Sequence, residues 1–147
     1  MDSNEVVNAF QNDSLGSDDA VGIANKIKKG ELSASLVTQD AIERAKAVNP
    51  KLNAITVENF DLAQKNSEKP FTGFFQGVPT FIKDTDEVPD LPLYLGSRSL
   101  PGEPSDKYSK AAKQIIDTGL NCLGTTTTPE FGLTGTTESL RFGATCN

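Results

Sequence analysis

Two short apolar segments with a helix between them constrain the fold of this chain most. Residues 78–83 and 121–124 each have the length and composition of a buried strand. Between them lie a connection rich in proline and glycine, residues 84–105, and a helical period that begins at Asp106. A strand, a helical crossover and a second strand normally form a right-handed parallel unit. The pattern therefore predicts an α/β fold in which these two strands are parallel neighbours.

Two helices are predicted ahead of these strands. The first begins after the N-cap Ser17 and ends at Gly30, which accepts a left-handed conformation. The second begins after the N-cap Ser33 and ends at Pro50, which cannot continue a helix without loss of a hydrogen bond. Three further elements complete the prediction: a strand at residues 54–57, a helix at 59–67 and a short helix at 129–132. We expect N-terminal helices and the first strands of a mixed sheet that is covered by helices.

The helix after Asp106 has an apolar face in the sequence. Its helical spacing is expected to turn four side chains inward and to stop at Gly119. The four are Tyr108, Ala111, Ala112 and Ile115.

The chain divides at residue 16 into two parts of different composition. Residues 1–16 are polar and rich in Asn, Asp and Ser, which predicts a flexible N-terminal segment. Residues 17–147 are predicted to form the N-terminal portion of a larger domain, since residues 142–147 complete no element. A chain of 147 residues is long enough to bury a core of its own.

Charge and composition exclude several classes of function. The net charge of −6 and the isoelectric point near 4.6 disfavour a surface for nucleic acid. No apolar stretch approaches the roughly 20 residues of a membrane span, and no signal-peptide pattern opens the chain, so we expect a cytoplasmic protein. The sequence has no histidine, which removes Ser-His-Asp and Cys-His catalysis within this chain. Its two cysteines, Cys122 and Cys146, lack metal-ligand spacing, which disfavours a zinc site.

The end of the 78–83 strand carries the residue with the clearest chemical interest. Alternation along the strand places Phe81 and Lys83 on one face. A lysine that is buried loses its charge more readily, and neutral lysine acts as a general base. A simpler reading leaves Lys83 in water at the strand end beside Asp84. The residues alone leave both readings open.

Five motifs follow one another in a set order after the second helix. They are Gly-Val-Pro-…-Ile-Lys-Asp at residues 77–84, Gly-Ser-Arg at 96–98, Thr-Pro-Glu-Phe-Gly at 128–132, Thr-Thr-Glu-Ser at 136–139 and Phe-Gly-Ala-Thr-Cys-Asn at 142–147. Each is modest by itself, but their order and spacing are specific. From about Gly16 to its last residue, the chain resembles the amidase signature family.

This resemblance implies an amidohydrolase with a Ser–cis-Ser–Lys triad. The triad lysine falls on Lys83, while the two serines and the oxyanion loop belong to segments expected after Asn147. The reaction would release acid and amine through an acyl-serine intermediate, without a cofactor, from a small-molecule amide. Neutral lysine can activate a serine through a second hydroxyl, which suits a chain without histidine.

Three positions depart from the usual family pattern. Thr125 stands where lysine is common, Thr127 where asparagine is common, and Cys146 where arginine is frequent. These departures affect the inference of substrate more than that of family.

Two alternatives to a free-standing amidase stay open at this point. One is the glutamine-amidase subunit of a tRNA-dependent amidotransferase, and the other is a truncated fragment without catalysis. The 147-residue chain alone is expected to be inactive. A homodimer of the full-length protein also stays open.

Overall fold

A three-stranded mixed sheet lies at the centre of residues 7–146, the part of the chain that the computed structural model describes. Its order is β1 (Ile55–Glu58), β3 (Asn121–Thr126), β2 (Pro79–Lys83). The central strand β3 runs parallel to β2 and antiparallel to β1. The predicted parallel pair is therefore confirmed, and β3 extends two residues beyond its predicted end.

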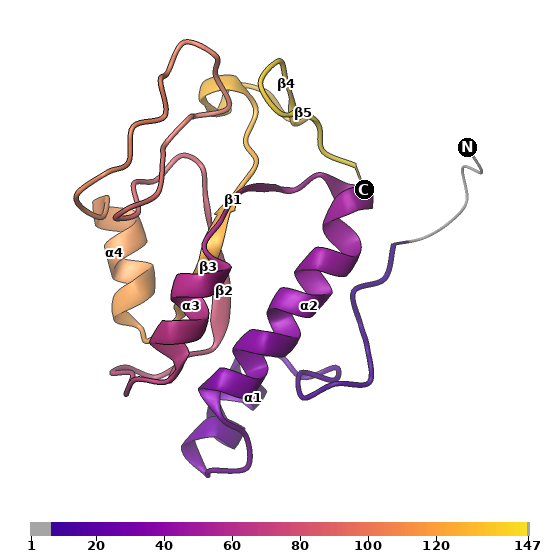
Figure 1. The fold of residues 1–147 in the computed structure, drawn as a ribbon, viewed down its shortest axis with the longest axis vertical. Helices are drawn as coiled ribbons and strands as arrows, with labels where there is room; N and C mark the ends of the chain where they lie inside the picture. Colours follow the sequence, from indigo (N-terminus) through magenta and orange to yellow (C-terminus); the bar gives the residue numbers. More distant parts are fainter. Residues whose placement is uncertain (1–6, 147) are drawn as a thin grey trace.

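Helices cover both faces of this sheet (Figure 1). The helices α2 (Ala34–Leu52) and α3 (Phe60–Ser67) pack on one face, and α4 (Lys110–Asp117) packs on the other. The first helix, α1 (Ala20–Lys28), lies beside the beginning of α2. The predicted mixed sheet covered by helices is confirmed.

Two buried clusters fill the space between sheet and helices. The cluster under α2 and α3 contains Leu123 and receives Phe81, whose ring meets Phe60 edge-on at 6.5 Å. The cluster under α4 contains Ile82 and Ala112. Consecutive residues of β2 therefore face opposite layers, as strand alternation predicts.

The first helix begins two residues later than the sequence predicts. Asp19, and not Ser17, is its N-cap, and the Asp19 carboxylate accepts the Gly22 N–H at 2.7 Å. A carboxylate stabilises the positive end of a helix more than a hydroxyl does, which explains the choice. Gly30 follows the helix with φ +73°, in the predicted left-handed stop.

The second helix starts at its predicted cap but does not end at Pro50. The Ser33 side chain accepts the Leu36 N–H, and the helix then runs through Pro50 to Leu52. Proline near a helix end removes a single N–H, and its fixed φ is helical, so the last turn forms nevertheless. The helix stops at Asn53, which adopts a left-handed conformation with φ +51°.

The helix α4 begins at the N-cap Ser109 and not at Asp106. Its inward side chains are Ala112, which is buried, and Ile116, which packs against the same cluster and lies one turn later on the same face. Tyr108, just before the helix, packs against this cluster as well. The two other residues predicted to point inward are exposed: Ala111 and Ile115. Gly119, with φ +96°, follows the helix as predicted.

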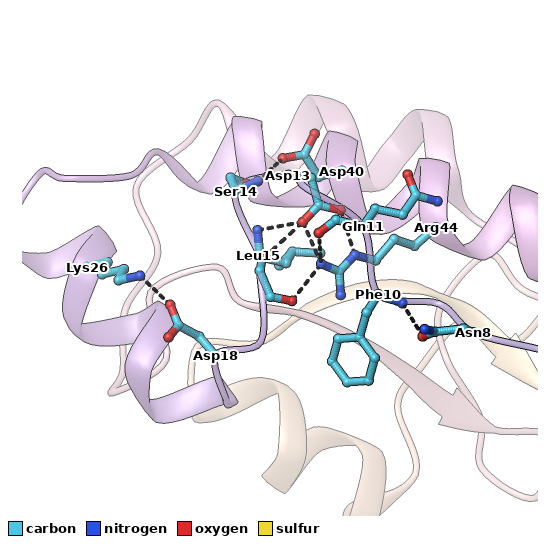
Figure 2. A network of polar contacts seen from close by, with 11 residues as sticks. Asn8, Phe10, Gln11, Asp13, Ser14, Leu15, Asp18, Lys26, Asp40 and Arg44 are labelled. Atoms are coloured by element: carbon cyan, nitrogen blue, oxygen red, sulfur yellow. Dashed lines mark hydrogen bonds and ion pairs between the residues drawn. The ribbon is translucent and has the colours of Figure 1, made fainter.

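The residues that directly precede α1 hold the N-terminal segment against α2 (Figure 2). The Arg44 guanidinium donates to the Asp13 carboxylate, with Nε at 2.6 Å, and to the Gly16 carbonyl at 2.8 Å. The Leu15 side chain is buried in the core beside α1 and α2. Residues 1–6 lie outside the described part, and the predicted flexibility of residues 1–16 stays a prediction.

Candidate functional site

Lys83 is the last residue of β2, and its side chain is exposed. It lies opposite Thr126 of the parallel neighbour β3, so both residues stand at carboxyl ends of strands. The chain turns at once, because the Asp86 N–H bonds back to the Lys83 carbonyl at 3.1 Å. Within residues 7–146 no carboxylate forms an ion pair with Lys83. The structure thus presents an exposed lysine side chain at the end of a strand.

Asp84, the next residue, is fully buried, with 0% of its surface exposed. Its main-chain N–H continues the sheet by bonding to the Thr126 carbonyl at 2.9 Å. Its carboxylate accepts the Tyr94 N–H at 3.0 Å and the Gly96 N–H at 3.2 Å. Burial raises the pKa of the Asp84 carboxyl, while the two N–H donors and the Arg141 guanidinium oppose that rise.

The turn 94–97, whose main-chain N–H groups donate these bonds, belongs to the long connection 84–105, which contains no helix or named strand. The buried Ser97 hydroxyl donates to a Glu130 carboxylate oxygen at 2.5 Å. Arg141 donates to the Ser97 carbonyl at 3.1 Å and lies 3.9 Å from the centre of the Tyr94 ring. The turn therefore joins the end of β2 to residues 130–141.

A hydroxyl-rich run, residues 125–128, forms the end of β3 and the two residues that follow it. The hydroxyls of Thr125 and Thr128 are buried, and neither has a hydrogen-bond partner among the residues described. Thr127 shares a hydrogen bond of 2.7 Å with Thr145, which ties this run to the last described residues. The site thus collects one exposed ammonium, one buried carboxylate and several hydroxyls.

Sequence reasoning placed Lys83 at this strand end and did not identify Glu130 or Arg141. Glu130 bonds to a hydroxyl 33 residues away, and Arg141 bonds to a carbonyl 44 residues away. Neither separation leaves a local periodic signal. Arg98, the arginine of the Gly-Ser-Arg motif, is exposed.

Two further properties of the described residues bear on the class of site. No three cysteine, aspartate or glutamate side chains of residues 7–146 gather as a metal site requires. No helix in that same part of the chain has the length and apolar character to cross a membrane.

Comparison with known protein sequences finds relatives along most of the chain. The family model described as Amidase matches residues 36–147. A protein of Mycobacterium leprae, provisionally named amidase AmiC, is 38% identical over 141 residues, which cover 96% of this chain and 30% of that protein. A glutamyl-tRNA(Gln) amidotransferase subunit from Prochlorococcus marinus is 27% identical over 133 residues, which cover 85% of this chain and 27% of that protein.

Comparison with solved structures also finds a hydrolase. The solved structure of 6-aminohexanoate cyclic dimer hydrolase complexed with substrate matches with a TM-score of 0.82 at 32% identity. The match covers 88% of this chain and 27% of that one. The chain spans about 30% of the length of the curated relatives it matches.

Proposed function

Because this chain belongs to the amidase family, we propose that the protein hydrolyses the C–N bond of a carboxylic amide, with Lys83 as the lysine of its triad. In addition to the family membership, one structural observation supports the assignment of Lys83. Lys83 of the Ile-Lys-Asp motif stands at the carboxyl end of a parallel strand, beside the end of β3. Ligands of open α/β sheets bind outside the carboxyl ends of the strands, so this edge favours a site.

The proposed mechanism uses Lys83 in its neutral form. Neutral Lys83 takes a proton from a bridging serine, which takes one in turn from the nucleophilic serine as that oxygen attacks the amide carbon. The amine departs with the proton that Lys83 returns through the bridging serine, and water then hydrolyses the acyl-serine to release the acid. Both serines belong to segments proposed to follow Asn147, and no serine of this chain is assigned either role.

Neutral Lys83 requires an environment that residues 7–146 do not supply. Its side chain is exposed, and an exposed ammonium keeps its water shell. We propose that the remaining part of the enzyme covers the ends of β2 and β3 and excludes this water. A dry site also strengthens every electrostatic interaction made with the developing oxyanion.

We propose a small-molecule amide as the substrate. The solved neighbour with 32% identity is a hydrolase described in complex with its substrate, a cyclic dimer of 6-aminohexanoate. Thr125 and Thr127 stand where the family commonly has lysine and asparagine, in the part of the site expected to lie near the substrate. The acyl group and the amine of the substrate are therefore to be identified by assay. No residue of this chain is assigned to a cofactor.

The amidotransferase alternative has a specific observation in its favour, the similarity to a glutamyl-tRNA(Gln) amidotransferase subunit. That identity of 27% is lower than the 38% shared with the mycobacterial protein, which favours a free-standing amidase. The alternative requires glutamine as the amide and partner subunits for activity. A protein without any amidase activity is the third reading.

The test is an amidase assay on the complete protein. We expect release of ammonia or amine from at least one member of a panel of acetamide, benzamide, acetanilide, glutamine and a dipeptide amide. Lys83→Ala should lower kcat by about three or more orders of magnitude, as loss of a proton-relay residue does. Lys110→Ala, at the exposed start of α4, is the matched control and should leave kcat unchanged.

Results other than these would favour one of the alternative functions. Full turnover by Lys83→Ala would remove the triad assignment. Glutamine as the single substrate, hydrolysed only with partner subunits, would favour the amidotransferase. No hydrolysis of any amide by the wild-type protein would favour the non-catalytic alternative.

A further inference from the structure

We propose that Asp84 is a positioning residue for the reaction of Lys83, an inference that rests on the function proposed above. The Asp84 carboxylate fixes the turn 94–97 against the end of β2. That turn is hydrogen-bonded to Glu130, Phe131 and Arg141, so Asp84 would set where these residues lie relative to Lys83. Asp84 itself touches neither substrate nor the reacting atoms.

Lys83 and Asp84 are adjacent in the chain but differ in burial. Lys83 is exposed at the end of β2, whereas Asp84, in the turn that follows, has 0% exposure. A buried carboxylate is unfavourable unless it is hydrogen-bonded. Its two oxygens each accept a main-chain N–H, one from Tyr94 and one from Gly96. Hydrogen bonds to a charged acceptor are among the stronger ones in proteins, so this attachment is firm.

The turn has little freedom to occupy another position. Leu95 and Gly96 both have positive φ, +49° and +65°. A Cβ atom at Gly96 would lie 2.4 Å from the Thr128 carbonyl oxygen, so the turn packs directly on the main chain that follows β3. A left-handed leucine is unfavourable by itself and persists only where surrounding contacts impose it. The Asp84 carboxylate provides two of these contacts.

Three hydrogen bonds connect the turn to residues 130–141. The Leu95 carbonyl accepts the Phe131 N–H at 2.8 Å. The Ser97 hydroxyl donates to Glu130 at 2.5 Å, and the Ser97 carbonyl accepts from Arg141 at 3.1 Å. A shift of about 1 Å in groups around a reacting centre lowers turnover by roughly 100-fold. Loss of the Asp84 carboxylate is therefore expected to affect turnover more than substrate affinity.

The experiment compares Asp84→Asn with Lys83→Ala in the complete protein, assayed on the best amide of the panel. Asparagine keeps one acceptor oxygen but places an NH2 group against the second N–H donor. We expect kcat to fall by about 10- to 100-fold with KM within about twofold of wild type. Hydrogen exchange at the Tyr94 and Gly96 amides should become faster in the same variant.

Asp90→Asn is the matched control. Asp90 lies in the same connection, is exposed, and has φ +66°, a conformation that asparagine accepts readily. Its kcat, KM and amide exchange at residues 94–96 should equal those of wild type. General damage by an Asp-to-Asn change in this connection would appear in both variants.

The outcomes separate this inference from the function on which it rests. Wild-type kcat in Asp84→Asn, with Lys83→Ala inactive, would overturn the positioning role alone. A rise in KM at unchanged kcat would also overturn it, since that result indicates a role in binding. An inactive wild type, or full turnover by Lys83→Ala, would overturn the proposed function and this inference with it.

A second variant keeps the test decisive if Asp84→Asn does not fold. Glu130 is exposed and accepts the Ser97 hydroxyl, so Glu130→Ala loosens the same connection from its outer end. We expect a loss in kcat of about 3- to 10-fold with KM unchanged. A wild-type kcat in Glu130→Ala would count against the connection.

Discussion

The Arg44 guanidinium of α2 donates to the Asp13 carboxylate, and this pair holds the chain before α1 against the longest helix (Figure 2). Both side chains are largely buried, each with 13% of its surface exposed. The same guanidinium also bonds to the Gly16 carbonyl and lies 5.6 Å from the centre of the Phe10 ring. The pair therefore supports the placement of Leu15 in the core.

Asp13→Ala is expected to lower the free energy of unfolding by about 1–3 kcal/mol. The change leaves a largely buried guanidinium without its carboxylate, which is more destabilising than loss of an exposed pair. The measurement is urea denaturation followed by circular dichroism. Asp18→Ala is the control, since the Asp18–Lys26 pair is more exposed, at 34% and 42%, and its loss should lower the free energy of unfolding much less. Equal losses in the two variants would contradict the prediction.

Acid should weaken the fold through Asp13. The hydrogen bond from Arg44 lowers the pKa of the Asp13 carboxyl below its ordinary 3.8. A folded-state pKa below that of the unfolded chain stabilises the fold above pH 3.8, and this contribution disappears as the pH falls through the folded-state pKa. Asp13→Asn should therefore be less stable than wild type at neutral pH and lose less stability between neutral pH and pH 3. Parallel stability curves would show that another group is responsible.

Gly124 should not tolerate a side chain. It has φ +144°, and a Cβ there would lie 2.1 Å from the Val57 carbonyl oxygen on the neighbouring strand. We expect Gly124→Ala to lower the free energy of unfolding by about 3 kcal/mol or more, because β1 and β3 must separate. Gly135→Ala, where nothing lies within 4 Å of the added Cβ, should change it by less than about 0.5 kcal/mol. A thermal melt of each variant measures the difference.

Asn53 combines two roles that a pair of variants separates. It ends α2 with φ +51°, and its side-chain amide donates to the Phe142 and Ala144 carbonyls at 2.7 and 3.0 Å. Asn53→Gly keeps the left-handed conformation and loses only the two hydrogen bonds. Asn53→Ala loses both features and should be less stable than the glycine variant by about 0.5–1 kcal/mol. Equal stability in chemical denaturation would show that conformation contributes little here.

The chain of residues 1–147 taken alone should show no amidase activity and bind a hydrophobic dye. Three large apolar side chains near the proposed site are exposed: Phe131 at 48%, Leu133 at 80% and Leu140 at 75%. The strand β2 is also an edge of its sheet, and such edges recruit further strands. Dye fluorescence and an amide assay test both expectations. A cooperative melt without dye binding would contradict the expected exposure of apolar surface, and amide turnover would contradict the expected inactivity.

Features fixed by neighbours in the sequence were predictable. Ser33 and Gly30 lie where their capping roles predict, because a cap bonds within its own helix turn. The start of α4 was predicted three residues early, since Asp106 and Ser109 are equally good caps in isolation. The packing of Tyr108 and Ile116 under α4 selects between them.

The amino-acid sequence by itself determined the α/β class, the parallel pair of strands, the family motifs and the place of Lys83 at a strand end. These follow from periodicity, local capping and the order of residues along the chain. The tertiary structure decided that Asp84 is buried, that Arg141 reaches the turn 94–97, and that Asp13 binds Arg44. Those contacts join residues that are 10 to 44 positions apart, and only folding brings such groups within hydrogen-bonding distance.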